Sequence, residues 1–196
     1  MRVGTKRPGG RSADNLARIM AATADLLVEK GYGRLTTEDV AERAGVHRST
    51  VHRRFPTRAE LMAQMMTSLA AERVPVPDTG RLDSDLLAFA RAVRRATADP
   101  IAGAITRAVV AEGGDRTELG AVSAAFWAGR WEAAGDIVRR AIARGELPQA
   151  TDHRLLVELV VAPIHFRTFI TGDAVTDDLL AEVVATVVSS ARPPSA

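Results

Sequence analysis

The stretch over residues 36–61, TTEDVAERAGVHRSTVHRRFPTRAEL, constrains the fold of this chain more than any other. Thr36 suits the N-cap of a helix, and Asp39 three residues later fits a capping box. Gly45 then offers the left-handed backbone at which a helix can stop. A second short helix follows and must end near Pro56, because the residue before a proline disfavours helical geometry. Two short helices joined by a tight turn form the helix-turn-helix pattern, whose second helix enters the DNA major groove.

The second helix of this pattern carries many hydrogen-bond donors and no acid. Arginine can hold guanine O6 and N7 with two hydrogen bonds, and serine and threonine reach base edges or phosphates. The donors in and before this helix are His47, Arg48, Ser49, Thr50, His52, Arg53 and Arg54. A solvated basic face is the alternative interpretation. Because the run follows a capped helix and a glycine turn, and Val51 and Phe55 can anchor it, the pattern favours DNA binding.

Charge is distributed unevenly along the chain. The net charge of +2 is too small to indicate nucleic acid by itself. However, residues 1–60 hold 12 Lys/Arg and 7 Asp/Glu, which gives +5, whereas residues 61–196 carry −3. An electropositive N-terminal part suits a protein that displaces counterions from DNA. Residues 1–11 are expected to form a flexible basic arm that either enters a minor groove or remains a solvated tail.

Residues 36–61 resemble the helix-turn-helix of TetR/AcrR-type bacterial transcriptional regulators, in register and without gaps, and the resemblance extends over roughly residues 12–70. It implies contacts to DNA at specific positions. These are Thr37 and His52 at phosphate-contacting positions, Arg48, Ser49 and Thr50 at base-contacting positions, and Arg58 at a position usually occupied by lysine. His52 departs from the family pattern, which usually has a tyrosine there.

Hydrophobic periodicity predicts helices along the whole chain. The predicted helices outside the helix-turn-helix span residues 12–30, 58–73, 82–98, 100–112, 117–144, 152–170 and 176–190. No segment alternates cleanly with period two, so the predicted fold class is all-α. We expect an N-terminal three-helix domain with the helix-turn-helix at residues 12–57. The resemblance implies that residues 58–196 form a helical domain for ligand binding and dimerisation.

The last two predicted helices are more apolar than burial of one face requires. The resemblance implies that they pair across a two-fold axis into a four-helix bundle. Two buried faces on each helix would account for the surplus, and a large monomer core is the alternative. The predicted dimer-interface residues are Leu156, Val160, Ile164, Leu180, Val184 and Val187.

Aromatic residues in the C-terminal part suggest a pocket for a hydrophobic effector. Trp127 and Trp131 are four residues apart and share one helix face. Pro163, inside an apolar helix, is expected to kink it beside His165. The candidate lining residues are Phe89, Arg107, Trp127, Trp131, His165, Phe166 and Phe169. The alternative is an ordinary core, because aromatics at helical spacing more often pack in the core than bind ligands.

Other function classes lack their sequence signatures. The chain has no cysteine, and its four histidines show no metal-ligand spacing. Neither a phosphate-binding loop nor a nucleophile elbow is present, so we expect no enzyme, no metal and no cofactor. Without an apolar run of roughly 18 residues or a signal core, we expect a cytoplasmic protein that does not contact a membrane.

The predicted function is therefore a homodimeric regulator, more a repressor than an activator, that a small-molecule effector releases from a palindromic operator in double-stranded DNA. Two alternatives remain open at this point. One is a constitutive DNA-binding regulator without a ligand. The other is a protein-interaction module that uses the helix-turn-helix for protein contacts.

Overall fold

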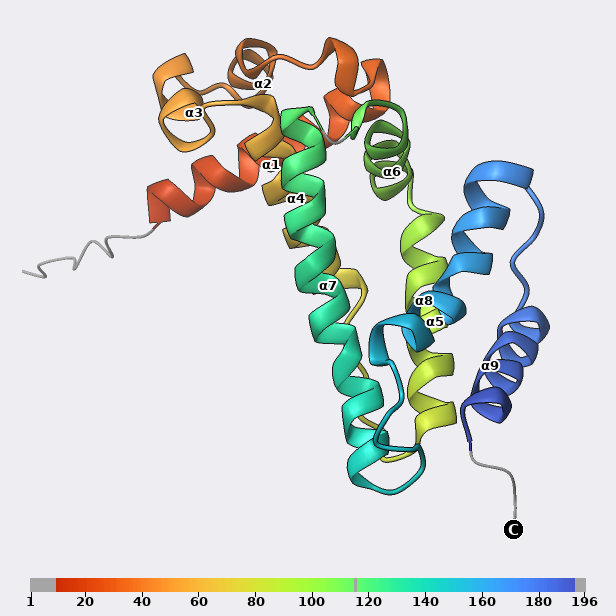
Figure 1. Cartoon of the computed structure of the whole chain (residues 1–196). Helices are drawn as coiled ribbons and strands as arrows, with labels where there is room; N and C mark the ends of the chain where they lie inside the picture. The colour runs from red at the N-terminus through yellow and green to blue at the C-terminus, as the bar shows by residue number, and fades with distance from the viewer. Residues whose placement is uncertain (1–9, 115, 193–196) are drawn as a thin grey trace, which may run out of the picture. The chain divides into compact units, whose positions relative to one another are not determined.

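The computed structural model describes residues 10–114 and 116–192, which form helices and connecting turns and no strand (Figure 1). The α-helices are α1 (Gly10–Lys30), α2 (Thr37–Ala44), α3 (Arg48–Arg54), α4 (Arg58–Arg73), α5 (Leu82–Thr97), α6 (Pro100–Glu112), α7 (Glu118–Ala143), α8 (His153–Phe166) and α9 (Asp177–Ala191). A 3-10 turn, η1 (Tyr32–Arg34), precedes α2, and a π-helical turn, η2 (Arg167–Thr171), follows α8. The predicted all-α fold class is confirmed.

Most predicted helix boundaries agree with the structure to within one or two residues. The exception is the helix predicted over residues 152–170, because α8 stops at Phe166 and the chain continues as the π-helical turn η2. Of the predicted basic arm, only Gly10 and Arg11 lie among the described residues, where they begin α1.

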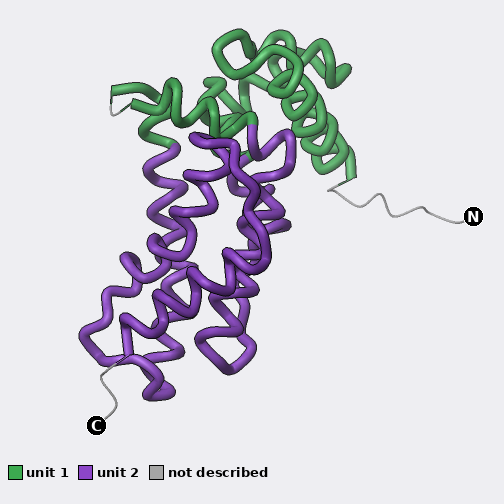
Figure 2. The backbone as a smooth tube through the Cα atoms, turned by 90° about the vertical axis from the view of Figure 1, so that its right-hand side faces the viewer, with its two compact units in different colours: residues 1–65, 104–122 green, residues 66–103, 123–196 purple. Residues whose placement is uncertain are grey.

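The chain divides into two compact units (Figure 2). Unit 1 comprises residues 1–65 and 104–122, and unit 2 comprises residues 66–103 and 123–196. This division differs from the boundary predicted after residue 57. The first turns of α4 belong to unit 1 with their fully buried Leu61 and Met62, and a segment distant in sequence joins the same unit.

In unit 1, α1 packs against α2, and α2 packs against α3. The predicted cap is present, since the side chain of Thr36 accepts a hydrogen bond from the backbone N–H of Asp39 at 3.1 Å. Two ion pairs join α1 to α2, between Lys30 and Asp39 and between Glu29 and Arg43. The buried side chains of this unit include Ile19, Leu27, Leu35, Val40 and Val51. They fix the two helices that carry the helix-turn-helix.

In unit 2, α5 packs against α8 and α9, which also pack against each other. The segment over residues 74–80, which lies between the helices predicted over residues 58–73 and 82–98, is held along its length. Arg130 of α7 donates to the carbonyl oxygen of Val74 at 2.8 Å, and Arg140 donates to that of Pro77. Burial lowers the pKa of Arg130, whose guanidinium still finds this carbonyl partner.

The predicted dimer-interface residues lie inside unit 2, where the single chain already buries most of them. Five of them are at most 4% exposed and form the core of the unit, namely Leu156, Val160, Ile164, Leu180 and Val184, while Val187 is half-buried against that core. The exposed apolar side chains lie elsewhere on α8 and η2: Leu155, Leu159, Phe166 and Ile170. An apolar pattern on two faces of a helix does not reveal which face the chain itself buries.

Candidate nucleic-acid interface

Helix α3 presents a basic surface on unit 1. Val51 is fully buried and Phe55 is 4% exposed, so these two side chains anchor the helix to the core. The exposed residues at and along α3 are His47, Arg48, Ser49, His52, Arg53 and Arg54, whereas Thr50 is half-buried. The structure thus brings the predicted donors of this helix together on its exposed surface.

Three of these side chains are uncommitted among the residues that the structure describes. Arg48, His52 and Arg53 form no side-chain hydrogen bond, ion pair or ring contact there. His47 instead caps the helix, because its Nδ1 accepts from the backbone N–H of Ser49 at 3.3 Å. The guanidinium of Arg54 lies 5.8 Å from the centre of the Phe55 ring. The free donors are therefore the ones best placed to bind a ligand outside the chain.

The turn before α3 is fixed by backbone and side-chain hydrogen bonds. Gly45 adopts a left-handed φ of 62°, as predicted, and its N–H donates to the carbonyl of Glu42 at 3.1 Å. The N–H of Val46 donates to the carbonyl of Ala41 at 3.0 Å. Arg18 of α1 adds hydrogen bonds to the carbonyl oxygens of Ala44 and Gly45. These contacts set the direction in which α3 leaves α2.

Two further predicted DNA contacts lie outside α3. Thr37 is half-buried at the first position of α2, and its hydroxyl donates to a carboxylate oxygen of Glu38 at 3.2 Å. Arg58 is turned inward, since its Nη1 donates to the carbonyl oxygens of Tyr32 and Gly33, each at 3.1 Å. Sequence reasoning did not identify these partners of Arg58, because nothing local links positions so far apart.

The predicted effector-binding residues come together only in part. In unit 2, Trp127 stacks on Trp131 with ring centres 5.7 Å apart. The ring centre of His165 lies 6.2 Å from that of Trp127 and 6.1 Å from that of Phe169. Phe126, which was not predicted, meets Trp127 edge to face. The other three candidates do not join this aromatic cluster: Phe89 is in the core, Phe166 is 56% exposed, and Arg107 is exposed on unit 1.

His165 of the aromatic cluster is half-buried. Its Nδ1 lies 3.2 Å from the carbonyl oxygen of Val161, one turn earlier on α8. Burial lowers the pKa of His165, because a low-dielectric environment disfavours the imidazolium, and this outweighs the carbonyl contact.

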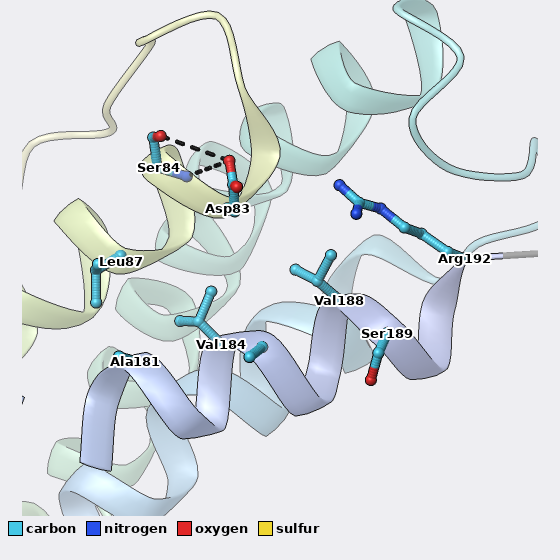
Figure 3. Close-up of a pocket in the computed structure, with 9 residues that line it drawn as sticks. Asp83, Ser84, Leu87, Ala181, Val184, Val188, Ser189 and Arg192 are labelled. Carbon is cyan, nitrogen blue, oxygen red and sulfur yellow. Dashed lines mark hydrogen bonds between the residues drawn. The ribbon is translucent and has the colours of Figure 1, made fainter. Parts of the chain in front are cut away.

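A groove of about 380 Å³ lies between α5 and α9 of unit 2 (Figure 3). Its apolar lining includes Leu87, Val184 and Val188, with Asp83 on α5 and Arg192 at the end of α9. The hydrogen bonds from Arg81 lower the pKa of Asp83 to about 2, so this carboxylate is ionised at neutral pH. None of the predicted effector-binding residues lines the groove. The groove could not be predicted from the sequence, because only tertiary packing brings α5 and α9 together.

None of the described helices has the length and apolarity needed to cross a membrane. The described residues also contain no group of three or more His, Asp or Glu side chains arranged to hold a metal ion.

Models of two protein families match the chain. The model described as "Bacterial regulatory proteins, tetR family" matches residues 19–65, which include the helix-turn-helix. The model described as "Tetracyclin repressor-like, C-terminal domain" matches residues 76–187, more than half of the chain.

Similar proteins cover nearly the whole chain. The regulator AqdR of Rhodococcus erythropolis is 30% identical over 91% of this chain and 86% of its own length. The uncharacterised regulator Mb1581 of Mycobacterium bovis is 32% identical over 87% and 84%. Among solved structures, the TetR family transcription regulator SCO0332 has a TM-score of 0.74 at 24% identity, covering 92% of this chain and 100% of its own.

Proposed function

Because the chain belongs to the TetR family of DNA-binding transcriptional regulators, we propose that it is a homodimeric repressor that a small molecule releases from a palindromic operator. The observation that carries the DNA-binding part is the exposed surface of α3. Arg48, His52 and Arg53 are free there among the described residues, and α3 carries no acid.

In the proposed complex, α3 lies in the major groove and Arg48 reads a base. A guanidinium can hold guanine O6 and N7 with two hydrogen bonds, whereas Ser49 and Thr50 offer hydroxyls at the same end of the helix. Thr37, His52, Arg53 and Arg54 supply phosphate contacts, which fix the register of the helix on the duplex. In a symmetric dimer, two copies of α3 would read half-sites about 34–36 Å apart, one turn of DNA.

The proposed dimer uses the exposed apolar face of α8 and η2. Leu155, Leu159, Phe166 and Ile170 are between 51% and 66% exposed, which is costly for such side chains in water. In a dimer, this face of one copy would pack against the same face of the second copy. This is expected for a two-fold interface, in which both subunits use the same patch.

The proposed effector is a small apolar or aromatic molecule that binds at the aromatic cluster of unit 2. Trp127, Trp131, His165 and Phe169 supply flat apolar surfaces, and the lowered pKa of His165 keeps its ring neutral at pH 7. Ligand coupling is reciprocal, so an effector that weakens DNA binding must itself be bound more weakly by the DNA complex.

Selection of binding sites from a random duplex pool at two salt concentrations tests this function. We expect recovery of an inverted repeat with half-sites about one turn apart, and steeply salt-dependent binding. A single half-site would remove the dimer from the proposal. A defined operator that no apolar compound displaces would favour a constitutive regulator. No recovered motif, with only weak binding, would favour a protein-interaction module.

A further inference from the structure

Arg58, the first residue of α4, is surrounded by partners from unit 1. Its guanidinium carbon lies 4.4 Å from the centre of the Tyr32 ring, and its Nη1 donates to the carbonyl oxygens of Tyr32 and Gly33. Both carbonyls belong to the 3-10 turn η1, which only Leu35 separates from the N-cap of α2. The side chain thus combines a cation–π contact with two charge-assisted hydrogen bonds.

Glu112 approaches the same guanidinium from the last turn of α6. Oε2 of Glu112 lies 3.9 Å from Nη2 of Arg58. A Cβ atom built on Gly33 would lie 3.2 Å from Oε1 of Glu112. A carboxylate at the C-terminal end of a helix is unfavourable, because it faces the negative end of the helix dipole. The nearby guanidinium of Arg58 offsets this cost and so stabilises the carboxylate of Glu112 at this position.

The turn between α6 and α7 supports the position of Glu112. The hydroxyl of Thr117 donates to the carbonyl oxygens of Glu112 and Gly114, at 2.9 and 3.0 Å. The same oxygen accepts from the backbone N–H of Gly120 at 2.9 Å. A cavity of about 570 Å³ beside these residues is bordered by Tyr32, Arg58, Glu112 and Glu118.

We propose that Arg58 is a positioning residue, which with Tyr32 and Glu112 holds the turn before α2 against the start of α4 and the end of α6. This rests on the proposed DNA-binding function, in which α2 contributes Thr37. To bind a phosphate, Arg58 would have to leave two carbonyl oxygens and an aromatic face. If Arg58 has this positioning role, operator affinity depends on Glu112, an acidic residue far along the chain from α3. A phosphate contact by Arg58 would not require Glu112.

Operator binding by Arg58→Lys, Arg58→Ala and Glu112→Gln tests the proposal. Lysine keeps the charge but cannot hold two carbonyls and cover the ring as a planar guanidinium does. We therefore expect Arg58→Lys to weaken binding about tenfold, the loss of one charge-assisted hydrogen bond. Glu112→Gln should weaken it by a smaller factor of about three. The salt dependence should stay that of the wild type in both variants. Glu118→Gln removes the same charge beside the same cavity and should bind normally.

A phosphate role for Arg58 makes the opposite predictions. Arg58→Lys would then bind like the wild type, Arg58→Ala would lower the salt slope by about one contact, and Glu112→Gln would bind equally or more tightly. Any of these results in a folded variant would overturn the proposal.

Titration of Tyr32 tests the contact network without DNA. Tyr32 is the one tyrosine of the chain, so the ultraviolet absorbance of tyrosinate reports on it alone. Burial raises the pKa of Tyr32, Arg58 lowers it and Glu112 raises it. Glu112→Gln should therefore lower the pKa of Tyr32, and an unchanged value would contradict the network. If the wild type binds no DNA but this shift is seen, the function fails and the network stands.

Discussion

The guanidinium of Arg18 lies 3.3 Å from the carbonyl oxygen of Gly45, so a residue of α1 closes the turn that leads into α3. The same Nη1 is 3.2 Å from the carbonyl oxygen of Ala44, and Nη2 is held by Asn15 at 2.6 Å. A carbonyl at the end of a helix lacks an intrahelical partner, and here a side chain from another helix supplies one.

Replacing Arg18 with alanine should therefore lower the free energy of unfolding by about 1 kcal/mol, the usual net worth of such hydrogen bonds. It should also weaken binding to all DNA sequences alike, because α3 loses a constraint and keeps its side chains. Urea unfolding and operator titration measure the two effects. Arg11→Ala is the control, since Arg11 is exposed on the same helix and has no side-chain contact among the described residues. Equal stabilities of the two variants would contradict the role of Arg18.

Arg48→Ala should cost about 1–3 kcal/mol of binding free energy on the preferred operator and relax the preference at one base pair. The reason is that Arg48 is exposed and uncommitted among the described residues. Titrations of operator variants against the mutant protein measure this loss. Arg192→Ala removes the same charge from an exposed position on unit 2 and should bind like the wild type. A uniform loss on every sequence would reassign Arg48 to a phosphate.

Leu159→Lys should convert the proposed dimer to a folded monomer, because the side chain is 51% exposed on the apolar face of α8. Ile164→Ala provides the contrast. Ile164 is fully buried, so truncating it should cost about 2–5 kcal/mol of stability and leave the face of α8 intact. Sedimentation and chemical unfolding separate the two outcomes. A dimeric Leu159→Lys protein would exclude this face as the interface.

Gly120 and Gly129 of α7 should respond in opposite ways to the same substitution. A Cβ at Gly120 would lie 2.1 Å from the carbonyl oxygen of Gly114, which forces the backbone to move, whereas one at Gly129 meets nothing within 4 Å. We expect Gly120→Ala to destabilise the protein by about 1–3 kcal/mol. Gly129→Ala should stabilise it by up to about 1 kcal/mol through helix propensity. Thermal unfolding of both variants checks this, and a stabilised Gly120→Ala protein would show that the contact is absent.

Stability should fall as the pH drops below the ordinary histidine pKa of 6.5, with His165 as one cause. Its pKa is lowered in the folded protein, so the unfolded chain binds more protons between the folded value and 6.5. The contribution is therefore fully present above 6.5 and is lost as the pH falls through this window. Urea unfolding across the window measures the slope, which His165→Phe should reduce. An identical slope in that variant would remove His165 as the cause.

Local chemistry made much of the fold predictable from the sequence. Thr36, Thr57, Asp152 and Thr176 each cap the following helix with a side-chain oxygen that accepts from a backbone N–H. Gly45 takes the left-handed conformation that only its lack of a Cβ makes cheap. The α3 donors are predictable for a similar reason, since a short capped helix anchored by Val51 and Phe55 leaves most of its other residues exposed.

Features that depend on tertiary packing could not be predicted in this way. The pattern on α8 showed two apolar faces, but only the packed unit distinguishes the buried Val160 from the exposed Leu159. Likewise, Arg58 has a basic side chain beside a helix-turn-helix, and its carbonyl partners lie 25 and 26 residues away. The aromatic cluster forms only because α7 and α8 pack side chain against side chain. Four of the seven predicted effector-binding residues lie in it, and three do not.

The inclusion of residues 104–122 in unit 1 bears on how operator specificity can be transplanted between relatives. A chimera that exchanges residues 1–65 as a block would combine a foreign Tyr32 and Arg58 with the host's Glu112. Unit 1 would then contain two segments from different proteins, whose contacting side chains need not fit each other. Grafting only the exposed positions of α3 leaves every buried partner native. The portable module of this protein is therefore the outer surface of one seven-residue helix, which is smaller than the folded unit that carries it.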